Sequence, residues 1–250
     1  MTCTLGDWLH ERPFHLALSA GFFGFFSHAG LLAALEDAGL RPAGVTGASA
    51  GALSGGLWAA GLDADTLRDE LASLRRAHFW DPGPGAGLLR GRLMRRKLES
   101  ILPTARFDGT RVPFAASVFD LLSRSTRVVR EGDLAAAICA SSALPGLFQP
   151  VWIRGRPCID GGVLDRPAHA GLPPSERALY HHLASHSPWR WYAPQVPPRP
   201  DTLAIVLRDL PRSGPFRLDV GMVALDQTRR RAKRLLDAPV PEGGDGVMMD

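Results

Sequence analysis

The stretch GVTGASAGAL, residues 44–53, decides the fold of this chain. Residues 44–47 predict a short buried strand, and the small residues 50–60, followed by Gly61, predict a helix. The two are joined by a G-x-S-x-G pentapeptide centred on Ser49. A serine on such a sharp strand-to-helix turn has a strained backbone, so its neighbours must be very small. Those neighbours are Gly47, Ala48, Ala50 and Gly51.

Ser49 is therefore a candidate nucleophile. The helix that follows it directs N-terminal N–H groups at the serine, which favours negative charge developing there. The alternative interpretation is a glycine-rich turn that matches the pattern by chance, because the chain contains 27 Gly.

A second strand–turn–helix unit precedes this one. Residues 15–19 predict a buried strand, 20–24 a tight turn and 25–38 a helix, with Gly39 as its cap. Two such units within about 50 residues indicate an α/β fold with a parallel sheet. The turn is a candidate oxyanion loop, since exposed N–H groups there would stabilise a developing oxyanion. Its residues are Gly21, Phe22, Phe23 and Gly24.

The same turn has a simpler interpretation as strand–helix packing. Four phenylalanines lie in or beside it, and we expect at least two of them in the core. They are Phe22, Phe23, Phe25 and Phe26.

Asp160 is the candidate partner of the serine. It ends a short apolar strand at 158–160 and is followed by Gly161 and Gly162. The glycines would let this carboxylate approach another backbone closely, where it could orient or deprotonate a serine. The alternative is an ordinary Asp-Gly turn.

The remaining chain continues as one α/β domain, 1–250, with a core at about 14–210. Further helices are predicted at 63–77, 88–102, 132–140 and 219–236, and further strands at 114–119, 126–129, 151–153 and 202–207. Residues 172–200 contain seven prolines and are expected to be irregular. Residues 238–250 are expected to fray.

Composition excludes several classes of protein. With 45% hydrophobic and 22% charged residues in 250, the chain is neither disordered nor a coiled coil. Three cysteines without a C-x-x-C pair predict no disulfide framework and no zinc site, and no motif implies another metal or an organic cofactor. We expect a reducing, cytoplasmic location, and we see no targeting segment.

Charge-free stretches at 13–35, 42–62 and 134–153 are long enough to span a membrane, but glycine, serine and proline interrupt them. We interpret them as buried sheet structure. The chain has no P-loop, so the sequence does not predict nucleotide binding. The runs of arginine are typical of solvated helix faces, and we expect no binding of nucleic acid. Peripheral contact with an anionic membrane is one interpretation of the net charge of +4 and of Trp189, Trp191 and Tyr192 around Arg190. The alternatives for these aromatic residues are a lid packed on the active site and core packing under a loop.

Taken in order, these motifs resemble the patatin-like phospholipase family. The likeness rests on five segments, LALS (16–19), HAG (28–30), GASAG (47–51), SSALPGLFQPV (141–151) and DGGVLD (160–165). The resemblance implies a three-layer α/β/α fold with a mainly parallel central sheet. It also implies hydrolysis of lipid acyl esters by a Ser–Asp dyad, with Ser49 as nucleophile, Asp160 as general base and Gly21 with its neighbours as oxyanion loop. The sequence departs from the family pattern in that loop, where an expected Arg or Lys is missing.

Two other functions remain open. A carboxylesterase with a Ser–His–Asp triad would match the order Ser49, Asp160, then His169 or His181, although its nucleophile normally follows more strands. We expect His28 to be packed or capping, and His181, His182 and His186 to lie at the surface. The other possibility is a catalytically weak lipid-binding protein on the same scaffold.

Overall fold

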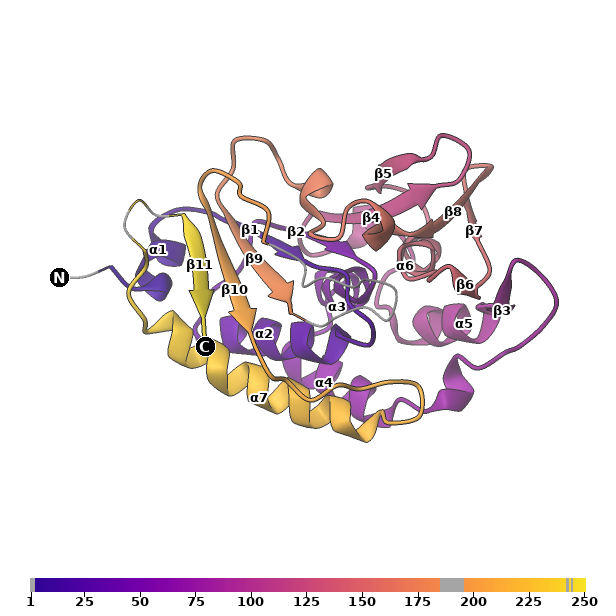
Figure 1. Cartoon of the computed structure of the whole chain (residues 1–250), viewed down its shortest axis with the longest axis horizontal. Helices are drawn as coiled ribbons and strands as arrows, with labels where there is room; N and C mark the ends of the chain where they lie inside the picture. Colours follow the sequence, from indigo (N-terminus) through magenta and orange to yellow (C-terminus); the bar gives the residue numbers. More distant parts are fainter. Residues whose placement is uncertain (1–2, 185–195, 242, 244) are drawn as a thin grey trace.

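A computed structural model describes residues 3–184, 196–241, 243 and 245–250. Its α-helices are α1 (Leu5–Glu11), α2 (Phe25–Asp37), α3 (Ala50–Ala59), α4 (Ala64–Ser73), α5 (Arg92–Ile101), α6 (Leu134–Ser141) and α7 (Asp219–Leu236). Short 3-10 turns are η1 (Arg76–His78), η2 (Phe107–Gly109), η3 (Gly161–Val163) and η4 (His169–Gly171). Figure 1 shows these elements around a central sheet.

The strands are β1 (His15–Leu18), β2 (Gly44–Ala48), β3 (Gly87–Leu89), β4 (Phe114–Asp120), β5 (Ser125–Val129), β6 (Gly146–Phe148), β7 (Val151–Ile153), β8 (Arg156–Asp160), β9 (Ala178–Leu183), β10 (Thr202–Leu207) and β11 (Gly246–Met249). The central sheet has the order β11-β10-β9-β1-β2-β4-β8-β7, and β5 also pairs with β4. In this spatial order, the strands from β11 to β4 run parallel to one another. Strands β5 and β8 pair antiparallel with β4, and β7 pairs antiparallel with β8. The expected mainly parallel sheet is confirmed.

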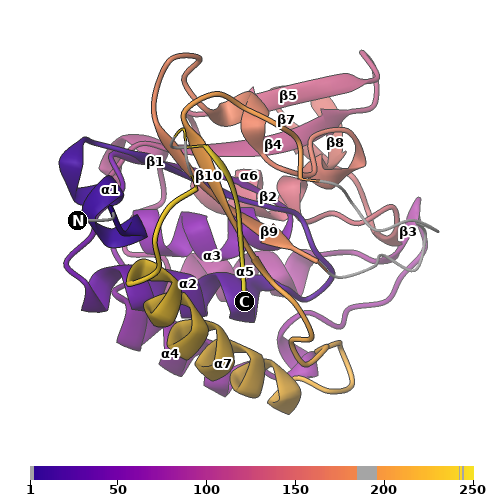
Figure 2. The ribbon, with the colours of Figure 1, turned by 60° about the vertical axis from the view of Figure 1, so that its left-hand side comes forward.

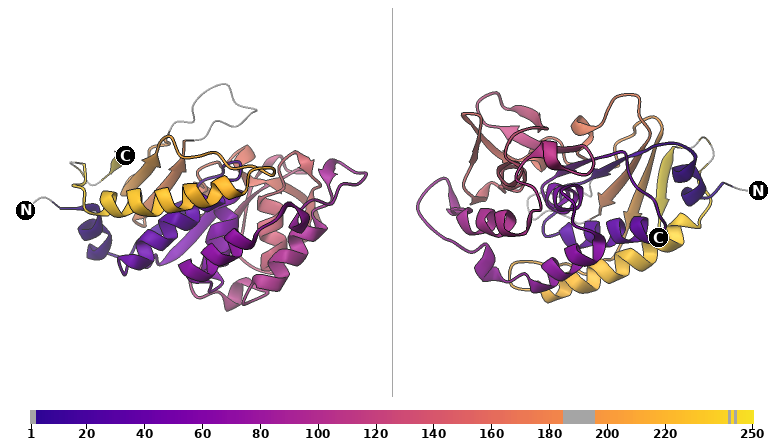
Figure 3. Two further views of the ribbon diagram at one scale, coloured as in Figure 1. Left: turned by 90° about the horizontal axis from the view of Figure 1, so that it is seen from below. Right: turned by 180° about the vertical axis from the view of Figure 1, so that it is seen from behind.

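Helices cover one face of this sheet. Figure 2 shows α2, α3, α4 and α7 together beneath the strands, and Figure 3 shows α7 lying along α2. Side chains from these helices and from β1, β2 and β4 form one hydrophobic core. In the described residues, the opposite face of the sheet carries the short turns η3 and η4 and irregular segments.

The ends of β2 and β8 meet along one side of β4. Ala48, the last residue of β2, pairs with Ser117, and Asp160, the last residue of β8, pairs with Val118. Strand β5 occupies the opposite side of both Ser117 and Val118. Because β2 and β8 run toward each other on the same side, their last residues pair with neighbouring residues of β4, and the ends of the two strands meet there.

Most of the elements that frame the site agree with the sequence patterns. Helix α7 has the predicted bounds, and β1, α2, β2 and α3 differ from prediction by one residue at an end. Phe25 and Phe26 are buried, as expected for at least two of the four phenylalanines. The predicted helix at 88–102 begins later, because residues 87–89 form a strand with β6.

Two expectations about the second half of the chain are wrong. Residues 178–183, inside the segment expected to be irregular, form β9 at the centre of the sheet between β1 and β10. Residues 246–249, expected to fray, form the edge strand β11 beside β10. In both places neighbouring parallel strands satisfy the backbone hydrogen bonds, a pairing that local sequence patterns do not reveal.

The core also extends beyond the expected range of 14–210. Leu5, Trp8 and Leu9 of α1 and Met248 of β11 belong to it. Thr4 caps α1 by accepting a hydrogen bond from the Asp7 amide. The Leu5 amide then donates to the carbonyl of Ala238, which ties the first helix to the end of α7.

The contact between α2 and α7 depends on Gly30. A Cβ on Gly30 would lie 2.3 Å from the carbonyl oxygen of Leu225 on α7. We expect Gly30→Ala to lower the free energy of unfolding by about 1–3 kcal/mol, because two helix backbones must separate. Urea denaturation followed by tryptophan fluorescence measures this difference. Gly214→Ala is the matched control, since no atom lies within 4 Å of the added methyl group; equal stability of the two variants would contradict the prediction.

Candidate active site

Ser49 lies on a strained turn between β2 and α3. Its φ and ψ are 53° and −118°, in the left-handed range that disfavours a side chain. A Cβ at Gly51 would lie 2.0 Å from the Leu18 carbonyl oxygen, and one at Gly47 would lie 2.5 Å from the backbone of Gly51 and Ala52. The small residues predicted around Ser49 are therefore required by close backbone packing.

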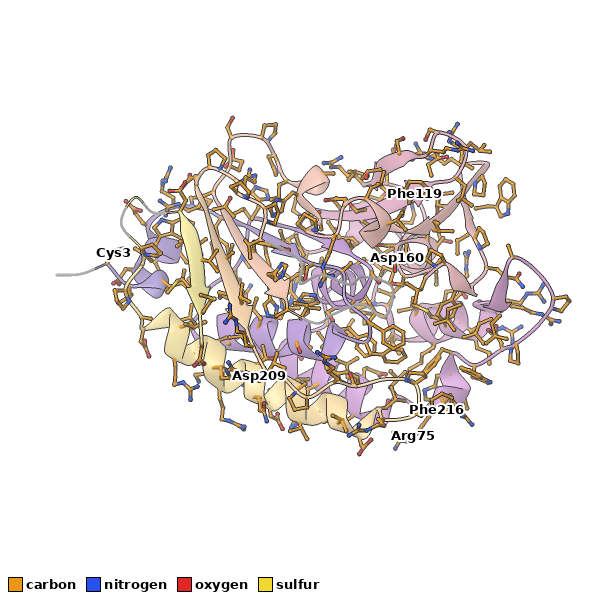
Figure 4. The ribbon with its side chains drawn as sticks, in the orientation of Figure 1. Cys3, Arg75, Phe119, Asp160, Asp209 and Phe216 are labelled. Carbon is orange, nitrogen blue, oxygen red and sulfur yellow. The ribbon has the colours of Figure 1, made fainter. Side chains whose placement is uncertain are left out.

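Asp160 lies next to this serine. The Ser49 hydroxyl lies close enough to its carboxyl group to lower the pKa of that group, and the Gly162 amide donates to Asp160 Oδ1 at 2.7 Å. Only 4% of Asp160 is exposed, and this burial raises its pKa to about 6, while the Ser49 hydroxyl and the Gly162 amide partly oppose the shift. Figure 4 shows Asp160 near the middle of the molecule, below Phe119 of the paired strand β4.

The glycines after Asp160 allow this approach. A Cβ on Gly161 would lie 2.1 Å from the Ser117 carbonyl oxygen, and one on Gly162 would lie 2.5 Å from Cβ of Ala20. Gly162 thus brings the Asp160 turn against the loop that follows β1. The three motifs that the sequence places at 20–24, 47–51 and 160–162 meet at one place in the fold.

The loop after β1 presents backbone amides at this place. Within the described residues, the N–H groups of Gly21, Phe22 and Phe23 donate to no protein acceptor, whereas the Gly24 amide donates to the Gly21 carbonyl at 3.2 Å. Three of the four predicted oxyanion residues therefore offer donors, and Gly24 uses its amide to shape the turn. Phe23 has φ of 52° and is held by a 2.9 Å hydrogen bond from Ser213 Oγ to its carbonyl.

These groups line one cavity of about 920 Å³. Ser49, Asp160, Gly21, Phe22 and Phe23 lie in its wall, and most of its other lining residues are apolar. A cavity of this size falls within the range of small-molecule and lipid-sized sites.

Two serines that the sequence patterns leave unassigned hold the nucleophile turn. Ser141 Oγ accepts from the Ser49 amide at 3.0 Å and donates to the Ser117 carbonyl at 2.6 Å. Ser142 Oγ donates to the Ser49 carbonyl at 3.2 Å. They belong to the SSALPGLF segment, so the resemblance marked this region, but no spacing rule indicated that these hydroxyls reach residue 49.

The expectation that His181 and His182 lie at the surface is wrong. Both are buried in β9; His181 Nδ1 lies 2.9 Å from His28 Nδ1, and His182 Nδ1 lies 2.8 Å from the Tyr180 hydroxyl. His28 is packed as expected, and its Nε2 donates to the Ser19 carbonyl at 2.8 Å.

The remaining histidines do not complete a triad in the described residues. The ring of His169 packs edge-on against Tyr180, with centroids 4.7 Å apart. In the part of the chain that the structure describes, His78 is the one histidine that lines the cavity, and its Nδ1 accepts from the Arg75 amide. His186 and the aromatic residues Trp189, Trp191 and Tyr192 lie outside the described residues.

The described residues show neither a metal-binding cluster nor a helix that could span a membrane. They contain no group of three or more His, Cys, Asp or Glu side chains arranged to hold a metal ion. None of their helices combines the length and the apolar character needed to cross a bilayer.

Comparison with known proteins defines the class of this fold and site. The model of the family described as "Patatin-like phospholipase" matches residues 16–172, so the chain belongs to that family. VipD from Legionella pneumophila has a similar fold, with a TM-score of 0.63 at 14% identity over 90% of this chain and 67% of that chain. The family implied by the sequence motifs and its α/β fold with a mainly parallel sheet are thereby confirmed. In the described residues, the expected second helical layer is represented only by short turns and irregular segments.

Among individual proteins, the chain is similar to an uncharacterized NTE family protein of Mycobacterium tuberculosis, at 34% identity over 60% of this chain and 42% of the relative. It is also similar to lysophospholipase NTE1 of Scheffersomyces stipitis, at 27% identity over 67% of this chain and 11% of the relative. The chain thus spans less than half the length of these curated relatives.

Burial of Asp160 has a consequence for stability. Because its pKa rises from 3.8 to about 6 on folding, the contribution of Asp160 to stability is most favourable below pH 3.8 and falls by about 3 kcal/mol as the pH rises from 3.8 to above 6. Asp160→Asn removes the charge and should be more stable than the native chain at pH 8, by up to this amount. The gain should shrink toward pH 4, as measured by urea denaturation at both values. If the free energy of unfolding changed equally with pH in the native chain and in Asp160→Asn, the destabilisation assigned to burial of the Asp160 carboxylate would be contradicted.

Proposed function

We propose that this chain is a lipid acyl-ester hydrolase that uses Ser49 as nucleophile and Asp160 as general base. The observation that carries the proposal is the position of Ser49 and the buried Asp160 carboxyl in the wall of one largely apolar cavity, where the ends of β2 and β8 meet on β4. Membership of the patatin-like phospholipase family supports the class of substrate. The name of the yeast relative, lysophospholipase, supports a lipid with an acyl ester bond.

The first half-reaction transfers the acyl group to the enzyme. Asp160 accepts the hydroxyl proton while Ser49 Oγ attacks the ester carbonyl. Negative charge on the carbonyl oxygen is stabilised by amides of Gly21 to Phe23 and by the N-terminus of α3. When the tetrahedral intermediate collapses, protonated Asp160 gives its proton to the leaving alcohol, and an acyl-Ser49 ester remains.

The second half-reaction uses the same groups. Asp160 takes a proton from a water molecule, the resulting hydroxide attacks the acyl-Ser49 carbonyl, and the proton returns to Ser49 Oγ as the carboxylic acid leaves. An isolated Asp is a weak base, but a pKa of about 6 makes Asp160 both ionised at neutral pH and a stronger proton acceptor than an exposed Asp.

Two substitutions test the dyad. Ser49→Ala and Asp160→Asn should each lower kcat/KM for p-nitrophenyl esters and lysophospholipids by at least about 10³-fold. His78→Gln is the matched control, because it changes the described histidine in the same cavity. Loss of activity on changing His78, with either dyad variant still active, would favour a triad esterase.

The pH dependence gives an independent test. Because Asp160 must be deprotonated to accept the serine proton, kcat/KM should rise with pH and level off above an apparent pKa of about 6. The native chain should also react covalently with a fluorophosphonate at Ser49. Absence of both labelling and turnover in a folded protein would instead identify a lipid-binding protein without catalysis, in keeping with the missing cation of the 20–24 loop.

A further inference from the structure

The cavity follows α3 away from the nucleophile. Ser49, Leu53 and Leu57, spaced one helical turn apart, all line it. Eight residues of α-helix correspond to a length of ~12 Å. The cavity therefore extends two helical turns from the serine hydroxyl, a direction that suits a chain attached to the ester carbon.

Two further helices form the outer wall of this cavity. Leu71 and Leu74 come from α4 and its end, and Met94, Leu98 and Ile101 come from one side of α5. In Figure 1, α3 is seen nearly end-on, with α4 below it and α5 to its right. An alkyl chain lying along α3 would thus exchange water for apolar side chains on several sides, which favours its binding.

One ion pair interrupts this apolar wall. Lys97 Nζ lies 2.7 Å from Glu70 Oε2 and joins α5 to α4. Both residues line the cavity, with 24% and 30% of their side-chain surfaces exposed. The backbones of α4 and α5 have little contact with each other, so this pair bridges a gap between the two helices.

We propose that the Glu70–Lys97 ion pair closes the side of an acyl-chain channel between α4 and α5 and thereby limits the length of the acyl chain. The proposal rests on the proposed function, which attaches the chain to Ser49. A chain that reaches Glu70 and Lys97 in the cavity wall can pass between α4 and α5 only by separating this pair. An alkyl group offers no hydrogen bond in return for separating Glu70 from Lys97, and the separated charges would face an apolar wall. The preferred substrate is therefore one whose acyl chain ends inside the cavity.

The test replaces the pair as a unit. Glu70→Leu combined with Lys97→Met keeps similar side-chain volumes and leaves no unpaired charge. We compare kcat/KM for p-nitrophenyl octanoate and hexadecanoate. The ratio of hexadecanoate to octanoate should rise about tenfold in the double variant, the effect of burying about two further methylene groups. The charge reversal Glu70→Lys with Lys97→Glu re-forms the pair and should keep the native ratio.

A second ion pair on α4 supplies the control. Arg68 Nη2 lies 3.0 Å from Asp226 Oδ1 and joins α4 to α7, and neither residue lines the cavity. Arg68→Met combined with Asp226→Leu should leave the ratio unchanged. An equal rise of the hexadecanoate-to-octanoate ratio in this control would show that loosening of α4 alone is enough to admit the longer chain. That result would overturn the proposal.

Binding separates this proposal from the proposed function. Octanoic and hexadecanoic acid compete with a fluorescent fatty acid for the protein, in the Ser49→Ala background and with the same pairs of substitutions. If esters are not hydrolysed at all but removal of the Glu70–Lys97 pair selectively strengthens hexadecanoic acid binding, the channel stands and the hydrolase proposal fails. If neither the kinetic ratio nor the ratio of affinities changes, the ion pair does not limit chain length.

Discussion

The candidate site depends on the way two strands end against the same side of β4. Strand β2 approaches from one direction and β8 from the other, and their last residues pair with Ser117 and Val118. Ser49, one residue beyond β2, and Asp160, at the end of β8, are therefore neighbours because of the hydrogen-bond register. Shifting either strand by one residue would turn its side chains to the opposite face of the sheet and separate the two groups.

This arrangement has an energetic cost. Asp160 is almost completely buried, and its raised pKa means that its ionised form destabilises the folded chain at neutral pH. The positive φ of Ser49 adds backbone strain at the same place. Buried packing of α2, α3 and α7 against the sheet offsets both, and the hydroxyls of Ser141 and Ser142 keep the strained turn in one conformation. Backbone strain and carboxyl groups with a shifted pKa both cluster at the functional sites of proteins.

The loop at 20–24 lacks the Arg or Lys of the family pattern. Aromatic rings gather at this loop: the Phe23 ring lies 4.9 Å from that of Phe22 and 5.9 Å from that of Phe79, centroid to centroid. The free amides come from the main chain, so their donor capacity does not depend on the lost Arg or Lys. The change makes the cavity more apolar beside Ser49, consistent with an alkyl-bearing substrate and with the apolar wall that α4 and α5 provide.

The sequence alone determined the local chemistry around residues 20–24, 47–51 and 160–162, because glycine requirements and strand–helix spacing are local properties of the chain. It also determined the first two strand–helix units and α7. Only the tertiary structure decided that β9 and β11 join the sheet, since a parallel strand gains its hydrogen bonds from partners distant in sequence. The burial of His181 and His182 follows from the pairing of β9 with β1 and β10. The reach of Ser141 and Ser142 to Ser49 and the raised pKa of Asp160 follow from the packing of α6 and β8 beside β4, because burial depends on which surfaces the fold removes from water.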